Sequence, residues 1–224
     1  MALLDLVAQD ARVLREIAKP VDPADIASAD IQDLIANMWE TMDASEGVGL
    51  AAPQVGRGLQ IFVLGDRARF IEKMDPRVLE ERKRGDTREI VAINPQLDLL
   101  GDNWADHPEG CLIVGPIRAL VVRSSSVRLT ALNSSGLWFA VELHGWPARI
   151  AQHEFDHLQG TLFVDRMEPG TDLAAADFET RWSGKPDAEI RPALGLPPAR
   201  YVDPPRAQFD VNESVRCDDQ PIRG

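Results

Sequence analysis

The sequence predicts an α+β fold in which short antiparallel or mixed strands pack around one central, metal-binding helix, with another helix near the N-terminus. Three observations lead to this expectation. Apolar residues recur with helical spacing between Asp25 and Met42. Short strand-like segments follow one another from residue 59 to residue 143. A His-Glu-x-x-His motif then occupies residues 153–157 within apolar sequence, so the helix that carries it is expected to be partly buried.

The composition fits one ample domain with an appendage. The 224 residues are 44% hydrophobic, which is enough for a core, and their formal net charge is −12. This charge disfavours nucleic acid and anionic membranes as partners. No apolar run is long enough to cross a bilayer, and Asp5 interrupts the apolar start of the chain, so no signal peptide is expected. We therefore expect a cytoplasmic protein.

The first helix is expected between Asp25 and Met42. Its apolar residues recur at three- and four-residue steps, and Ser28 or Asp30 is placed to cap it. The apolar stripe consists of Ile31, Leu34, Ile35, Met38, Trp39 and Met42. This pattern is typical of a helix that covers a core, and no chemistry is assigned to it.

A glycine-rich segment, Gly47–Gly56, follows the first helix. Its glycines disfavour a regular helix and allow the backbone to approach another group closely. A tight structural turn is the simpler interpretation of such a segment, and no Gly-Lys-Ser/Thr follows that would indicate a phosphate-binding loop. Gln54 is its one polar side chain with reach.

The strands come next. They are expected at residues 59–64, 90–93 with a continuation at 97–100, 107–112, 118–122, 127–132 and 138–143, with a hairpin turn at 133–136. The highly charged segment 67–88 is expected to be a solvated excursion or flap. Gly145-Trp146-Pro147 breaks the chain before the last helix, whose first turn tolerates a proline.

The His-Glu-x-x-His motif has a definite geometry on a helix. His153 and His157 are four residues apart, so both side chains lie on one helix face and can direct a ring nitrogen at one metal ion. Glu154 lies about 100° further around the helix, within reach of a metal-bound water. The motif also occurs by chance on solvated helix faces, but the apolar sequence around it favours a buried site. Two imidazoles leave a catalytic metal without its third protein ligand.

The chain has two cysteines, Cys111 and Cys217. A cytoplasmic location disfavours a disulfide between them. Cys217 lies in a polar, charged tail, where no special role is expected. Cys111 lies between Glu109-Gly110 and the strand-like residues 112–114, which is a more constrained setting.

Three segments occur together and in order: Gly47–Gln54, Glu109–Leu112 and Gln152–Gly160. With them the sequence resembles the peptide deformylases from about Arg12 to Met167. Gly145–Ile150 and the charged excursion are similar to the organelle-type subgroup. The resemblance implies a metallohydrolase domain at residues 1–168. The remainder, 169–224, is expected to be a Pro-rich, acidic C-terminal extension with a short helix near 172–182.

The resemblance also implies an activity, a metal and site residues. The resemblance implies an enzyme that removes the N-formyl group from formyl-methionine at the start of nascent peptides. This enzyme would contain one divalent metal ion, typically Fe(II), which zinc, nickel or cobalt can replace. The implied metal ligands are Cys111, His153 and His157. The implied catalytic residues are Glu154, which accepts and donates a proton, and Gln54 and Leu112, whose side-chain amide and backbone N–H would donate hydrogen bonds to the oxyanion. The implied substrate-binding residues are Val48, Gly49, Gly110, Trp146 and Ile150. The methionine side chain would lie near Trp146, Ile150 and His153. Ribosome-associated nascent chains are the implied partners, without direct binding to nucleic acid.

One departure and three alternatives accompany this expectation. Ile113 stands where the family usually has a small serine, and a bulkier residue there can reshape the substrate groove. A zinc endopeptidase would take its third ligand from a downstream carboxylate, Asp177 or Glu179. A deformylase-like enzyme could act on another N-formyl or N-acyl compound. An inactive scaffold with this fold would only bind.

Overall fold

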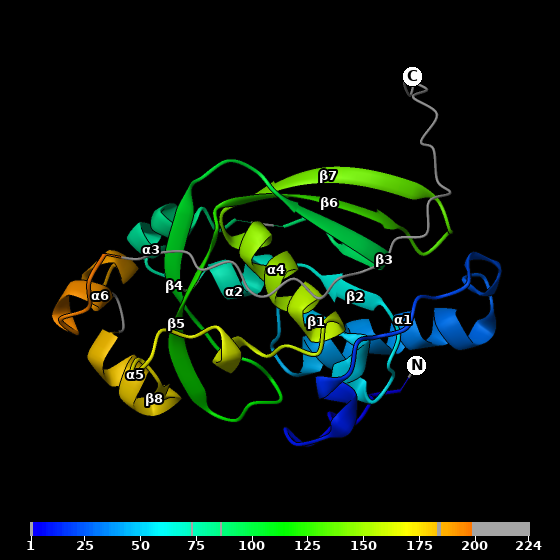
Figure 1. Cartoon of the computed structure of the whole chain (residues 1–224), viewed down its shortest axis with the longest axis horizontal. Helices are drawn as coiled ribbons and strands as arrows, with labels where there is room; N and C mark the ends of the chain where they lie inside the picture. The colour runs from blue at the N-terminus through cyan, green and yellow to red at the C-terminus, as the bar shows by residue number, and fades with distance from the viewer. Residues whose placement is uncertain (1, 73, 86, 183–184, 199–224) are drawn as a thin grey trace.

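Two antiparallel sheets meet around the helix that carries the His-Glu-x-x-His motif in this computed structural model (Figure 1). The structure describes residues 2–72, 74–85, 87–182 and 185–198. The five-stranded sheet has the order β1 (Gly49–Ala51), β2 (Ile61–Leu64), β3 (Ile90–Leu99), β6 (Ser126–Leu132) and β7 (Trp138–His144). The three-stranded sheet has the order β4 (Trp104–Glu109), β5 (Ile117–Ser124) and β8 (Leu173–Ala174). The predicted α+β class is confirmed.

The helices among the described residues are α1 (Ala29–Ala44), α2 (Ala68–Ile71), α3 (Pro76–Arg82), α4 (Trp146–Leu158), α5 (Ala175–Trp182) and α6 (Ile190–Ala193). Short 3₁₀ turns lie at Arg12–Arg15, Pro23–Asp25, Ala52–Val55, Phe163–Asp165 and Asp187–Glu189. None of the described helices is long and apolar enough to span a membrane.

Helix α1 has the predicted position and buried face. Ser28 precedes it, and its Oγ accepts a hydrogen bond from the Ile31 N–H at 3.4 Å, which satisfies one free donor of the first turn. Its apolar stripe packs against residues of β1, β2 and β3, including Leu50, Ile61 and Ile93. Helix α1 therefore covers one face of the five-stranded sheet.

Helix α4 begins at Trp146, with Pro147 in its first turn as predicted. Gly145 precedes it at φ 64°, a conformation that favours glycine. Ala148, Ala151 and Leu158 are fully buried against the larger sheet. Because α4 is buried on more than one side, its polar residues must find partners inside the protein.

The charged segment 67–88 is more structured than predicted. It contains α2 and α3, and the side chains of Arg82 and Arg84 are only 14% and 11% exposed. Each forms a two-point ion pair, Arg82 with Asp187 and Arg84 with Asp66. The prediction of a solvated excursion is wrong for the end of this segment, because its arginines find buried carboxylates elsewhere in the chain.

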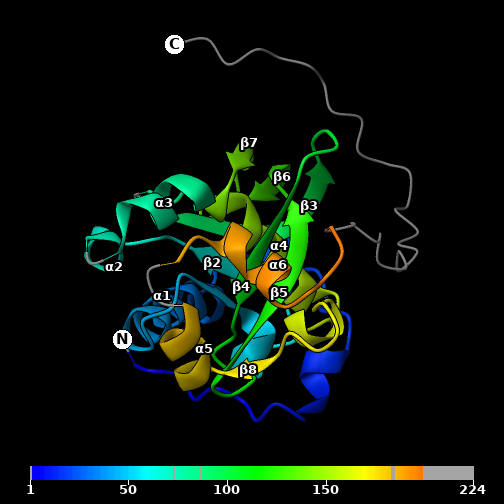
Figure 2. The same cartoon turned by 90° about the vertical axis from the view of Figure 1, so that its left-hand side faces the viewer.

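The C-terminal segment up to residue 198 packs against the three-stranded sheet, where α5 and α6 lie beside β4 and β5 (Figure 2). Phe178 and Trp182 of α5 form an apolar cluster with Leu120 and Ile190. The short helix expected near 172–182 is confirmed. Cys217 and the rest of the proline-rich stretch from 199 onward lie outside the described residues.

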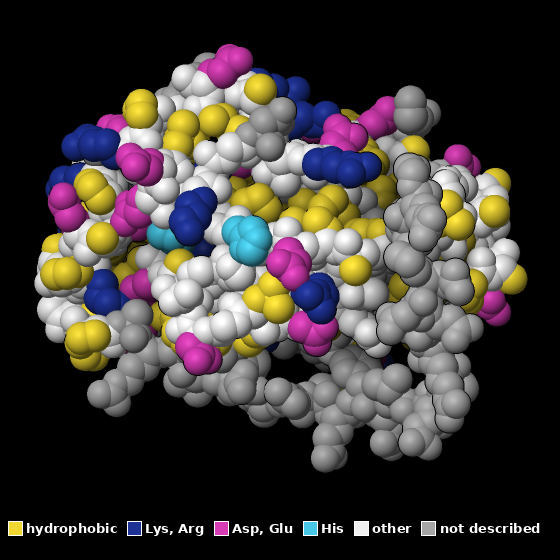
Figure 3. All heavy atoms as spheres, turned by 90° about the horizontal axis from the view of Figure 1, so that it is seen from above, with side chains coloured by type: hydrophobic (Ala, Val, Ile, Leu, Met, Phe, Trp, Pro, Cys, Tyr) yellow, Lys and Arg dark blue, Asp and Glu magenta, His cyan; other side chains and the backbone are white. Residues whose placement is uncertain are grey.

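Hydrophobic side chains also reach the surface in places, where they lie among basic and acidic ones (Figure 3). Leu137 and Trp138, at the β6–β7 turn, are 64% and 58% exposed. Isolated exposed hydrophobic residues are common on soluble domains and indicate no function by themselves.

Candidate metal centre

Cys111, His153 and His157 come together as one group of potential metal ligands. Their ligand atoms all lie within 4.8 Å of one another, and the Cys111 Sγ lies 3.3 Å from the His157 Nε2. A tetrahedral ion about 2.3 Å from sulfur and about 2.0 Å from nitrogen would hold its ligand atoms at a similar separation. Within the described ranges, this is the group found, and neither Asp177 nor Glu179 belongs to it.

Two elements position these ligands. Helix α4 presents His153 and His157 on one face, since four residues make about one turn. Cys111 lies two residues beyond the end of β4, in the turn that leads to β5, rather than on a strand as expected. The sulfur and the imidazoles therefore meet only because β4 packs against α4.

Glu109, the last residue of β4, holds His153 in place. Its Oε2 accepts a hydrogen bond from the His153 Nδ1 at 2.9 Å, which leaves Nε2 of that ring for a metal. The expected site did not include this role for Glu109. The only signal in the sequence is the position of this carboxylate, two residues before the candidate cysteine ligand.

A buried ion network fixes Glu109 in turn. Arg123 donates to both of its carboxylate oxygens, at 2.8 and 2.9 Å, and Arg149 donates to Oε1 at 2.6 Å. Arg123 also reaches Asp156 at 2.6 Å. Burial opposes the charge of Glu109, but the two arginines and His153 outweigh it and hold its pKa well below the ordinary value. Glu109 is therefore an ionised acceptor.

The pKa values of His153 and His157 are shifted in opposite directions, which is consistent with a cation bound between them and Cys111. Burial disfavours a charged His153, but Cys111 and Glu109 outweigh it and raise its pKa well above the ordinary value. Burial, followed by the nearby His153, lowers the pKa of His157 well below the ordinary value. One of the two imidazoles therefore favours the charged form and the other the neutral form, and a divalent metal can supply the positive charge in place of the proton.

Glu154 lies next to this centre without being one of its ligands. It is 4% exposed, and its Oε2 has no hydrogen-bond partner among the described residues. Burial raises its pKa to about 7. Its side chain packs on the Gly49 backbone so closely that a Cβ at residue 49 would collide with the carboxylate. A carboxyl group with such a pKa can both accept and release a proton near neutral pH.

Gln54 points its amide nitrogen at the centre. Its Oε1 accepts a hydrogen bond from the Ala51 N–H at 2.7 Å, so the Nε2 faces the other way and lies 3.5 Å from the Cys111 Sγ. The loop that follows Cys111 is also close, since a Cβ at Gly47 would lie 3.1 Å from the Leu112 Cδ1. The glycine-rich segment and the cysteine loop therefore border the same site.

The backbone positions expected to bind substrate lie along the two edges of this site. Gly49 is the first residue of β1 and Val48 directly precedes it, while Gly110 directly follows β4. The guanidinium of Arg118 lies over Gly110, where a side chain at residue 110 would collide with it. No pattern in the sequence indicates Arg118, because its closeness to Gly110 depends on the turn between β4 and β5.

Trp146 and Ile150 lie on α4 and are 9% and 3% exposed. The Trp146 ring is covered by two arginines of the charged segment. The guanidinium carbons of Arg82 and Arg84 each lie 5.0 Å from its centroid.

Ile113, the departure from the family pattern, is buried with Leu14, Phe163 and other residues of a separate apolar cluster.

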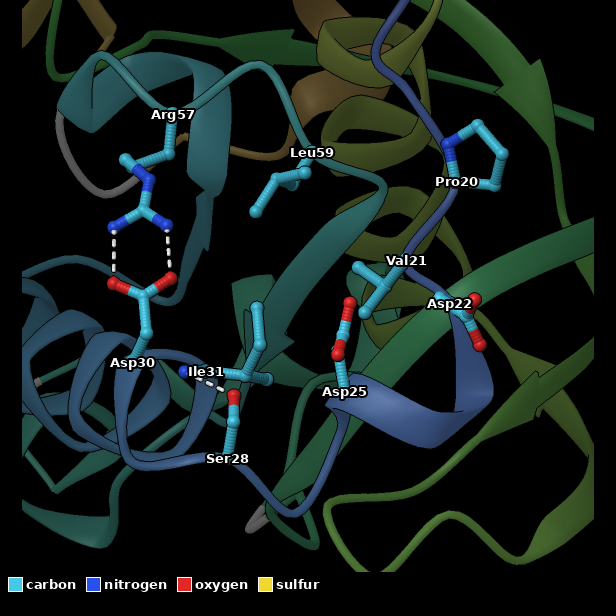
Figure 4. A pocket seen from close by; sticks show the side chains of 9 residues that line it. All are labelled: Pro20, Val21, Asp22, Asp25, Ser28, Asp30, Ile31, Arg57 and Leu59. Carbon is cyan, nitrogen blue, oxygen red and sulfur yellow. Dashed lines mark hydrogen bonds and ion pairs between the residues drawn. The ribbon is translucent and has the colours of Figure 1, made fainter.

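A hollow lies away from the candidate metal centre (Figure 4). It has a volume of about 410 Å³ and includes Arg57, which pairs with Asp30 at 2.5 and 3.2 Å. Its lining contains none of the candidate ligands.

Comparison with known proteins identifies similar chains. The family model described as polypeptide deformylase matches residues 3–172. The chain is 42% identical over 173 residues to peptide deformylase 1A, chloroplastic, of Solanum lycopersicum, covering 76% of this chain and 61% of the relative. It is 39% identical over 169 residues to the peptide deformylase of Acinetobacter baumannii, covering 75% and 85%.

Solved structures give the same result. A Met-Ala-Ser bound class I type b peptide deformylase from Acinetobacter baumannii has a TM-score of 0.66 and 31% identity, covering 74% of this chain and 99% of that one. The Thermotoga maritima peptide deformylase has a TM-score of 0.63 and 32% identity, covering 75% and 100%. The described C-terminal segment beyond residue 172 lies outside the family match.

Proposed function

Because this chain belongs to the polypeptide deformylase family, we propose that it hydrolyses the N-terminal formamide of formyl-methionyl peptides and releases formate. The expected family resemblance is confirmed. The single observation that supports the activity most strongly is the Cys111–His153–His157 group with the buried Glu154 beside it. The chain spans 61% of the tomato relative's length and 85% of the Acinetobacter relative's length.

The proposed metal site consists of Cys111, His153 and His157, with Fe(II) as the native ion and zinc, nickel or cobalt as substitutes. Thiolate and imidazole ligands suit each of these ions. When bound, the cation would supply Lewis acidity at the formyl group. Glu109 would keep the His153 ring oriented for it.

Side-chain and backbone groups of the protein would transfer the proton and stabilise the oxyanion. Glu154 would accept a proton from the attacking water through a carboxylate oxygen and return it to the departing amine nitrogen. The Gln54 Nε2 and the Leu112 backbone N–H would donate to the developing oxyanion. The fixed orientation of the Gln54 amide supports this role, because its Oε1 is already engaged by the Ala51 N–H.

The peptide would lie extended between Val48-Gly49 on one side and Gly110 on the other, as an added strand. The absence of a side chain at Gly49 and Gly110 supports close approach there, although Glu154 and Arg118 already occupy part of that space. The methionine side chain would lie near Trp146, Ile150 and His153. A homologous structure is described with Met-Ala-Ser bound, and we propose a peptide of that class as product.

Rates measured side by side test this function. The metal-loaded chain should release formate from formyl-Met-Ala-Ser far faster than from non-peptide formamides. Preference for a small N-formyl or N-acyl compound would favour the alternative substrate, and metal binding without formate release from any of them would favour the inactive scaffold. The endopeptidase alternative lacks support, since its carboxylate ligands lie apart from the cluster.

The proposal also covers the source of the substrate and the cellular compartment of the protein. Ribosome-associated nascent chains are the expected substrates, and the net charge of −12 disfavours direct binding to RNA. We propose a cytoplasmic location, where such chains are made. The tomato and Arabidopsis relatives are named as chloroplastic and chloroplastic/mitochondrial proteins, so fractionation of the source cell is the decisive measurement.

A further inference from the structure

Arg149 is a buried charge on the helix that carries both histidines. It is 3% exposed and lies four residues before His153, so its side chain is on the same face of α4, one turn earlier. Its guanidinium donates from Nη1 to the Glu109 Oε1 at 2.6 Å and to the Val121 carbonyl at 2.8 Å, and from Nη2 to the Ala105 carbonyl at 2.6 Å. One side chain of α4 therefore holds β4 at two residues and β5 at a third.

Strand β4 depends on this connection more than β5 does. Both strands approach α4 (Figure 1). Strand β5 is bonded to α4 by another residue as well, because the Gln152 side chain exchanges two hydrogen bonds with the Ser124 backbone, at 2.9 and 3.1 Å. Strand β4 is bonded to α4 through Arg149 and through the contact of Glu109 with His153. The position of β4 against the helix thus rests largely on Arg149.

The charge of Arg149 is not what Glu109 requires. Arg123 already donates to both oxygens of that carboxylate and is buried beside it. Arg149 brings a second positive charge into the same space. Burial lowers the pKa of Arg149, Glu109 opposes this and Arg123 adds to it, with a result of about 10. Two buried arginines against one carboxylate cost solvation and repulsion, which indicates that Arg149 serves through the geometry of its planar fork rather than through neutralisation.

We propose that Arg149 is a positioning residue of the metal centre, which fixes the separation between Cys111, carried by the turn after β4, and the histidines of α4. The inference rests on the proposed metal site and adds to it a residue that is not a ligand. Cys111 lies two residues beyond Glu109, the end of β4, so any sliding of β4 along α4 moves the sulfur and the acceptor of His153 together. The arginine fork resists such sliding because it holds several acceptors at fixed angles.

Two substitutions at residue 149 separate geometry from charge. Arg149→Met keeps an unbranched side chain and removes all of its donors, so affinity for Zn²⁺ in an equilibrium titration should fall about 10- to 100-fold. Arg149→Lys keeps the charge, but a compact ammonium cannot reach the three acceptors at once, so its affinity should fall by a comparable factor. Arg128→Met removes an exposed arginine of β6 and should leave the affinity unchanged. Full metal affinity in either folded Arg149 variant would overturn the inference.

The Co²⁺ form gives a readout that a loss of stability alone would not change. The visible absorption of Co²⁺ bound to a thiolate and imidazoles reports the geometry of its ligands. The band intensity per bound ion should fall in folded Arg149→Met, because the ligands are less well fixed, and should stay the same in Arg128→Met. An unchanged spectrum in Arg149→Met would assign the residue to stability alone and overturn the inference.

The unsubstituted chain provides an arm that needs no variant. If Arg149 holds β4 against α4 before metal binds, the β4 amides are already protected from hydrogen exchange in the metal-free chain. Addition of Zn²⁺ should then raise their protection by no more than it raises that of the β6 amides, since metal binding stabilises the whole fold. A gain for β4 at least about tenfold larger than for β6 would show that the metal fixes the strand, and would overturn the inference even if neither variant folded.

The outcomes separate the two levels. Failure of the unsubstituted chain to bind Zn²⁺ would overturn the proposed metal site and this inference with it. Metal binding with the expected losses in the variants, but no formate release from formyl-Met-Ala-Ser, would overturn the proposed activity and leave the role of Arg149 intact. Formate release by the unsubstituted chain with full metal affinity in Arg149→Met would overturn the inference alone.

Discussion

The Nδ1 of His153 donates a hydrogen bond to the Glu109 Oε2 at 2.9 Å, and this contact links the end of β4 to the candidate metal centre. Glu109→Gln weakens the acceptor that orients the ring, so metal affinity should fall about 10- to 100-fold. Equilibrium titration with Zn²⁺ or Ni²⁺ measures this. Glu142→Gln, which removes an exposed carboxylate of β7, is the matched control and should bind metal normally.

The identity of the third ligand can be tested by a pair of substitutions. Cys111→Ala should release the metal, because two imidazoles alone bind it much more weakly. Glu179→Ala should retain it, since this exposed carboxylate lies outside the ligand group. Metal content after dialysis is the measurement. The reverse pattern would support the endopeptidase alternative.

Glu154→Gln should lower kcat by about 10²- to 10⁴-fold, the usual contribution of a positioned proton acceptor and donor. The metal content should stay unchanged, because Glu154 is not a member of the ligand group. Formate release and metal analysis on the same preparation give both values. Activity close to that of the unsubstituted chain would remove Glu154 from the mechanism.

Gly49→Ala should displace the Glu154 carboxylate, since the new Cβ would collide with it. A displacement of about 1 Å at a catalytic group can cost about 10²-fold in rate, so we expect kcat to fall by roughly that factor. Gly85→Ala is the control, because a Cβ there meets nothing within 4 Å. A fully active Gly49→Ala enzyme would show that the carboxylate position is not critical.

Asp187 should contribute stability that depends on pH. Burial opposes its charge, but hydrogen bonds from His107 and Arg82 outweigh it and lower its pKa below the ordinary 3.8. A carboxyl whose folded pKa is lowered stabilises the fold fully above its unfolded pKa, and this contribution is lost as the pH falls through the folded value. The difference in free energy of unfolding between the unsubstituted chain and Asp187→Asn should be about 1–3 kcal/mol at pH 6 and shrink below pH 3.8. Denaturant titrations at several pH values measure it, and a difference independent of pH would contradict the ionised pair.

The sequence determined the local elements of this protein. The stripe from Ile31 to Met42 predicts α1 because helical periodicity is a local property, and Ser28 marks its start for the same reason. Pro147 in the first turn and the four-residue spacing of His153 and His157 likewise predict α4 and its ligand face. The third ligand followed from family resemblance, since no local pattern relates Cys111 to a helix some 40 residues away.

Only the tertiary structure decided which charges meet. Arg82 looked like part of a solvated run because charge in a sequence carries no information about a partner 105 residues further on. Packing of the extension against β4 brings Asp187 to it, and packing of β4 against α4 brings Glu109 to His153. Buried charges require such partners, and the distances that provide them are set by the fold rather than by any spacing along the chain.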